Sequence, residues 1–128
     1  MDADRVLRPA LWTTAAFNLG VALLIMFAES RPAQLAGLPE AGPALYRWLL
    51  AYLIGLFGVM YAWLAARPSI DRPMLVLATV GKAGAASVAV VCWLAGQATG
   101  RITLLASGDI VFAAIFVWWL SANSPQND

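Results

Sequence analysis

The chain contains four long runs of mostly apolar residues, which cover approximately residues 10–28, 44–66, 74–95 and 102–121. Each run is close to the ~20 residues that an α-helix needs to cross the hydrocarbon layer of a bilayer. Charged residues make up 12% of the sequence, whereas about a quarter is usual for a soluble domain. The sequence therefore predicts an all-α fold, an integral membrane four-helix bundle, in which residues 1–128 form a single transmembrane domain.

Short polar segments containing proline and glycine separate the four runs. Pro9 precedes the first run, and proline suits the first turn of a helix because its missing N–H would have no partner there. The segment ARPSIDRP at residues 66–73 is short, so the second and third helices are expected to be antiparallel neighbours. Gly96 and Gly100 favour a short turn before the fourth helix. These connections predict an up-down-up-down bundle with the N- and C-termini on the same side.

Aromatic and basic residues indicate how such a bundle would lie in the membrane. All six tryptophans fall near an end of a predicted helix, at the headgroup level that tryptophan prefers: Trp12, Trp48, Trp63, Trp93, Trp118 and Trp119. The side that carries the termini has Arg5, Arg8, Arg67 and Arg72, against Arg31, Arg47 and Arg101 on the other side. By the positive-inside rule, both termini are expected in the cytoplasm. We therefore expect a multi-pass protein of the bacterial inner (cytoplasmic) membrane.

Two charged residues lie inside predicted helices rather than at their ends. Lys82 is about nine residues into the third helix, ~13 Å from the cytoplasmic edge of the hydrocarbon, and Asp109 of the fourth helix lies ~18 Å from that edge. An unpaired charge at the bilayer centre costs roughly 2.5–3.5 kcal/mol. Gly81 and Gly84 allow neighbouring helices to approach, which indicates that Lys82 faces protein. We therefore predict a buried ion pair between Lys82 and Asp109.

Further polar side chains fall at a similar depth. Asn18 lies nine residues beyond Pro9 in the first helix, and Tyr52 of the second helix comes close to the same layer. Together with Ser107, these side chains could satisfy the remaining donors and acceptors of the pair. The candidate polar layer therefore consists of Lys82, Asp109, Asn18, Tyr52 and Ser107. A purely structural role, in which the pair sets the register of the helices, is as well supported by the sequence as a functional role.

The residue inventory excludes several kinds of site. Cys92 is the only cysteine, and a single cysteine cannot form an intrachain disulfide or a multi-thiolate metal site. The chain has no histidine, which removes imidazole ligands and Ser-His or Cys-His nucleophilic pairs. A net charge of +1 without a basic patch argues against nucleic-acid binding. We predict no catalytic, cofactor-binding or metal-binding residues and no cofactor.

Two segments carry a resemblance to a known group of proteins. The sequences YRWLLAYLIGLFGVMYAWLAARP, in the second helix, and GDIVFAAIFVWWL, in the fourth, resemble small bacterial four-helix inner-membrane proteins of the DoxX-like and related uncharacterised families. The resemblance implies a four-helix bundle and, in some members, association with respiratory or redox systems. It implies no settled activity that could be assigned to individual residues of this chain.

Three classes of function are compatible with these features. The first, which we favour, is a non-enzymatic accessory, assembly or interaction protein that contacts the lipid bilayer and a membrane-protein partner or further copies of itself. The second is a small proton-coupled transporter that uses Asp109 and Lys82, similar in size to four-helix multidrug exporters. The third is a membrane enzyme acting on a lipid or a quinone, with the same two residues as acid and base.

Overall fold

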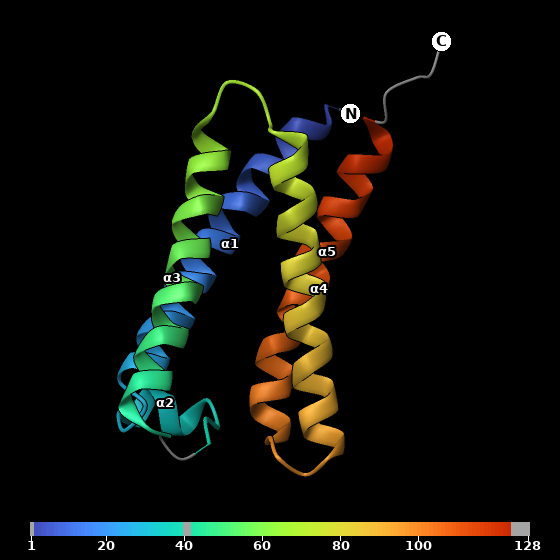
Figure 1. Ribbon diagram of the computed structural model, residues 1–128. Coiled ribbons are helices and arrows are strands. Elements are labelled where there is room, and N and C mark those ends of the chain that lie inside the picture. The colour runs from blue at the N-terminus through green and yellow to red at the C-terminus, as the bar shows by residue number, and fades with distance from the viewer. Residues whose placement is uncertain (1, 40–41, 124–128) are drawn as a thin grey trace.

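The computed structural model describes residues 2–39 and 42–123, and these residues form five helices and no strand. Four helices are long: α1 (Ala3–Met26), α3 (Ala44–Ala66), α4 (Arg72–Leu94) and α5 (Gly100–Ala122). All four are long and apolar enough to cross a membrane. The prediction of an all-helical protein with four long apolar helices is therefore confirmed, and the arrangement indicates a multi-pass membrane protein (Figure 1).

The helix α1 begins earlier than the sequence predicted. Asp2 caps its N-terminus, and the Asp2 side chain accepts a hydrogen bond from the backbone N–H of Asp4 at 3.2 Å. Pro9 consequently lies inside α1, not in its first turn as expected. The reason is packing, because Leu7 and Leu11 are both fully buried and lie four residues apart on one face of the helix. The burial of Leu7 favours helix before the apolar run begins.

A fifth, short helix was not predicted. The helix α2 (Arg31–Leu35) lies in the proline-containing connection after α1. Ser30 is its N-cap, and the Ser30 side chain accepts a hydrogen bond from the backbone N–H of Ala33. Pro32 occupies the first turn of α2, where it is tolerated. A capping serine and a proline in the first turn therefore favour this helix, which is too short to produce a hydrophobic pattern in the sequence.

The long helices pack as two pairs. The closest packing occurs between α1 and α3 and between α4 and α5, and α1 also contacts α5. Gly58 of α3 shows how closely the first pair approaches, because a Cβ atom at this position would lie 3.2 Å from the backbone oxygen of Ala15. The helices α3 and α4 are joined by a short turn, yet they share few close contacts among the described residues (Figure 1). A tight connection brings two helix ends together but does not decide which faces pack.

The buried core lies at one end of the bundle. Its large side chains come from the start of α1, the end of α3, the start of α4 and the end of α5, and they include Leu7, Leu11, Tyr61, Leu64, Leu75 and Phe116. We call this half of the bundle the closed half. The other half contains α2 and the turn between α4 and α5, and there the two pairs diverge (Figure 1). We call it the open half; its buried residues on the long helices are mainly small, such as Ala22, Ala51 and Ala86.

Hydrogen bonds join helix ends in the closed half. Arg8 of α1 donates to the backbone oxygens of Ala65 and Arg67 at 2.8 and 2.6 Å, at the end of α3. Arg72 of α4 donates to the backbone oxygens of Leu120 and Asn123, both at 2.9 Å, at the end of α5. The arginine side chains thus add hydrogen bonds at helix ends, where backbone oxygens lack the usual acceptor role within the helix ladder. Because each arginine near the start of one helix binds the end of another, the helices within each pair run in opposite directions.

A single described hydrogen bond connects the two pairs at the far end of the open half. The hydroxyl of Thr99, the N-cap residue of α5, donates to the backbone oxygen of Gly37 at 2.7 Å. Gly37 follows α2 and has a φ of 78°, a conformation that glycine adopts without a steric penalty. A Cβ atom at Gly37 would also lie 2.9 Å from Cβ of Arg101. The segment after α2 therefore rests directly against the start of α5.

Candidate functional site

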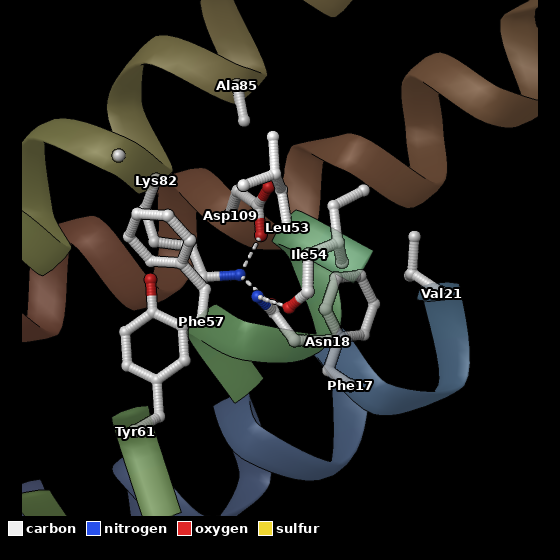
Figure 2. A pocket seen from close by; sticks show the side chains of 11 residues that line it. Phe17, Asn18, Val21, Leu53, Ile54, Phe57, Tyr61, Lys82, Ala85 and Asp109 are labelled. Atoms are coloured by element: carbon white, nitrogen blue, oxygen red, sulfur yellow. Dashed lines mark hydrogen bonds and ion pairs between the residues drawn. The ribbon is translucent and has the colours of Figure 1, made fainter. Parts of the chain in front are cut away.

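A buried group of three polar side chains joins the two helix pairs near the middle of the bundle. The Nζ atom of Lys82, on α4, lies 2.6 Å from Oδ1 of Asp109, on α5, and 2.5 Å from Oδ1 of Asn18, on α1 (Figure 2). Lys82 and Asp109 are 4% and 8% exposed. The ammonium of Lys82 donates a hydrogen bond to each of these oxygens. Lys82 is therefore bonded to α5 within its own helix pair and to α1 of the other pair. We refer to Asn18, Lys82 and Asp109 as the polar group.

Asn18 connects the polar group to α3, the one long helix that contributes no member to it. Its Nδ2 atom donates to the backbone oxygen of Ile54, on α3, at 3.3 Å. Gly58 makes this approach possible, because a Cβ atom there would lie 3.3 Å from Cβ of Asn18. With its amide oxygen facing Lys82 and its amide nitrogen facing α3, Asn18 uses both ends of its side chain. The polar group therefore makes hydrogen bonds to all four long helices.

Aromatic rings surround the ammonium of Lys82. Its Nζ atom lies 5.3 Å from the ring centroids of Phe17 and Tyr61, and 5.6 Å from that of Phe112. The faces of aromatic rings carry partial negative charge, and a cation within about 6 Å of a ring is attracted to it. The faces of these rings thus stabilise the charge of Lys82.

Electrostatics explain why these residues meet. A charged side chain in hydrocarbon is costly unless an opposite charge and hydrogen bonds compensate it. Lys82 has such compensation from the carboxylate of Asp109, the amide oxygen of Asn18 and the three rings. Removing one partner leaves the other charge uncompensated, whereas the two opposite charges of the intact pair cancel. The geometry therefore makes each member of the pair depend on the other.

A cavity of about 230 Å³ borders the polar group. Its polar wall contains all three members of the polar group together with Tyr61. Its apolar wall comes largely from α3, from Leu53, Ile54 and Phe57 (Figure 2). The other helices add Phe17 and Val21 of α1 and Gly81 and Ala85 of α4. Because residues of both helix pairs form its walls, we call this space the inter-pair cavity.

The structure brings together three of the five residues of the predicted polar layer. Lys82, Asp109 and Asn18 are in direct contact, but Tyr52 and Ser107 are not part of the group. Tyr52 is 63% exposed, and the hydroxyl of Ser107 donates to the backbone oxygen of Leu104 in its own helix, at 2.5 Å. The prediction for these two residues rested on depth alone. Depth does not specify the direction in which a side chain leaves its helix.

Tyr61 is the tyrosine that borders the polar group, and the sequence prediction missed it. Successive residues of an α-helix are rotated by about 100°, so positions nine residues apart, such as Tyr52 and Tyr61, point in opposite directions. A signal for the correct face was present, because Ala51, Gly58 and Ala65 are small residues spaced by seven, and all three are buried. Tyr61 follows Gly58 by three residues and shares that face.

Other features of the described residues add no second site. Within residues 2–39 and 42–123, no group of three or more histidine, cysteine, aspartate or glutamate side chains could hold a metal ion. Cys92 is a free, half-buried thiol. The polar group and the inter-pair cavity are therefore the candidate functional site.

Comparisons with known proteins do not assign this site. No protein-family model matches the chain, and no match is found among curated proteins or solved structures.

Proposed function

We propose that this chain is a non-enzymatic accessory or interaction protein of the bacterial inner membrane, and that its polar group holds two helix pairs in position for contact with another membrane protein. The resemblance of residues in α3 and α5 to DoxX-like proteins belongs to the same proposal. The observation that carries it is the bonding of Lys82 to both helix pairs, through Asn18 and Asp109.

The chemistry of the polar group supports this role. Both charges are engaged with each other at 2.6 Å, and the amide of Asn18 is bonded on both sides. Within the polar group, acid-base chemistry would have to use the Lys82–Asp109 pair, because the chain has no histidine. A pair that already holds the fold together is costly to use for catalysis, because any change in its charge also weakens the bundle.

The distribution of arginines supports the proposed orientation. Arg8 and Arg72 lie in the closed half, at the same end as the first residues of α1 and the last residues of α5. Arg5 and Arg67 lie at this end as well. With the positive-inside rule, this end would face the cytoplasm.

Purification in mild detergent tests the proposed function. The tagged chain is expected to elute in a stoichiometric complex with a larger membrane protein, with the mass measured by light scattering. The variant Lys82→Met should lose the partner, while Arg5→Gln, at an exposed position, should retain it. Circular dichroism would show that both variants keep their helices. An isolated chain with a catalytic or transport activity of its own would contradict the proposal.

The inter-pair cavity favours a second candidate, the small proton-coupled transporter. Asp109 and Lys82 border a cavity next to the divergent half of the bundle, where a substrate and a proton could compete for the same carboxylate. Proteoliposomes containing a pH-sensitive dye test this candidate with ethidium as the probe. Ethidium-driven proton movement that is lost in Asp109→Asn would favour the transporter, and no movement above protein-free liposomes would exclude it for this cation.

A further inference from the structure

We propose that the inter-pair cavity is a binding site for a neutral, lipid-soluble ring compound that carries a carbonyl or hydroxyl group and enters from the bilayer between α3 and α4. This inference goes beyond the proposed function, because it concerns a small ligand rather than a protein partner.

The position of the cavity provides the entry route. Leu53 and Phe57 of α3 face Gly81 and Ala85 of α4 across it, and these two helices share few close contacts among the described residues. Leu53 lines the cavity and is 44% exposed, so it stands at the rim. In a bilayer, the exposed side chains between α3 and α4 would meet lipid tails, not water. A ligand would therefore have to be soluble in hydrocarbon to reach the cavity.

Unused hydrogen-bonding capacity in the cavity wall indicates a ligand with a polar group. Tyr61 lines the cavity and is 1% exposed, so its hydroxyl is one of the few polar groups near this space. The ammonium of Lys82 has three N–H groups, of which two are bonded, to Asn18 and Asp109. A carbonyl or hydroxyl oxygen placed here would accept from Tyr61 or from the remaining N–H of Lys82.

Charge balance favours a neutral ligand. Lys82 and Asp109 carry opposite charges whose closest atoms are 2.6 Å apart, so the polar wall has no net charge. An ionic ligand would bring an uncompensated charge into hydrocarbon and lose its hydration there. A neutral carbonyl or hydroxyl compound gains hydrogen bonds from the wall without that cost.

The size and lining of the cavity favour a ring. The cavity measures about 230 Å³, whereas a cavity of ~150 Å³ is sufficient to bind benzene. Phe17 and Phe57 line it together with Tyr61, and aromatic rings pack favourably against one another in offset or edge-to-face arrangements. A six-membered ring with a short polar substituent would therefore fit the space and the lining.

Two matched probes test the proposal with the full chain in phosphatidylcholine nanodiscs. Acetophenone contains a ring and a carbonyl group, and ethylbenzene contains the ring alone. Binding is measured by equilibrium dialysis as the saturable excess over protein-free nanodiscs. We expect acetophenone to bind about five- to tenfold more tightly than ethylbenzene, as one additional hydrogen bond would provide. The infrared carbonyl stretch of bound acetophenone should shift to lower wavenumber.

Three variants locate the binding. Tyr61→Phe removes only the hydroxyl. It should weaken the binding of acetophenone several-fold and leave the binding of ethylbenzene unchanged. Ala85→Phe fills the cavity and should reduce binding of both probes. Ala83→Phe adds the same ring to an exposed position of α4 outside the cavity and should change neither. Equal binding of the two probes, no saturable binding, or equal losses in Ala85→Phe and Ala83→Phe would overturn the proposal.

Discussion

The closed and open halves of the bundle have the same apolar character but different packing. In the closed half, large side chains such as Leu11, Leu64 and Phe116 are fully buried between the helix pairs. In the open half, the buried residues on the long helices are mainly alanines, which bring the two helices of a pair together and leave little to fill the space between pairs. The position of large buried side chains thus decides where the bundle closes.

The difference between the halves also shows what holds helices together in a bilayer. Lipid tails are as apolar as leucine, so burying leucine between helices gains little from the hydrophobic effect. Close packing and hydrogen bonds are therefore the main interactions that hold helices together in a bilayer. The closed half has both, including the bonds from Arg8 and Arg72 to helix ends. At the far end of the open half, the described hydrogen bond between the two sides is that from Thr99 to Gly37, and the polar group lies at the border between the halves.

The largest expected effect comes from breaking the polar group at this border. Lys82→Met should lower the free energy of unfolding in detergent by about 3 kcal/mol or more, because Asp109 is left buried without its partner. The double variant Lys82→Met/Asp109→Leu should recover most of this loss. Thermal unfolding of the wild type, both single variants and the double variant gives the coupling energy. Additive losses in the double variant would show that the two charges are not coupled.

A smaller effect is expected from a cavity in the closed half. Phe116 is fully buried, and Phe116→Ala should destabilise the protein by about 2 kcal/mol, less than in a soluble core because the transfer contribution is small in lipid. Val88 is 63% exposed on α4, and Val88→Ala serves as the control, with an expected change close to zero. Denaturation in mixed detergent measures both. Equal losses would mean that Phe116 has no special packing role.

The arginine contacts of the closed half should contribute less than its core. Arg72→Gln removes the charged donors to the backbone oxygens of Leu120 and Asn123 and should cost about 1–2 kcal/mol. Arg5→Gln is the matched control, because the Arg5 side chain is 86% exposed and only approaches Asp2, at 3.8 Å. Its expected change is below about 0.5 kcal/mol. Both losses are measured by thermal unfolding. A larger loss of stability in Arg5→Gln than in Arg72→Gln would contradict this assignment.

The smallest effect on stability is expected at the far end of the open half. Thr99→Val removes the bond to Gly37 and the N-cap of α5, and should cost about 1 kcal/mol. Thr99→Ser keeps the hydroxyl and serves as the control. Spin labels at Gln34 and Gln97, with Cys92→Ala as background, report the distance between the pairs. A broader distance distribution is expected in Thr99→Val alone, and an unchanged one would show that this bond does not hold the open half.

The sequence predicts the depth of a polar residue in the membrane but not the direction of its side chain, and this limits how much of the site could be predicted. The depths of Lys82, Asp109 and Asn18 follow from counting residues along helices, and these three side chains do meet. Ser107 and Tyr52 lie at similar depth but point elsewhere. Phe112 could have been found, because it follows Asp109 by three residues and therefore shares its face. Tyr61 could have been found only by using the seven-residue spacing of small residues on α3 to choose the face that packs against α1.

The sequence by itself determined the four long apolar helices and the burial of two charges within them, because hydrocarbon thickness and the cost of a buried charge are properties of single segments. The tertiary structure alone decided that α1 pairs with α3 and α4 with α5, and that a cavity remains between the pairs. These features depend on how side chains of different size fit together across helices, and segments equally apolar in composition can fit in several ways.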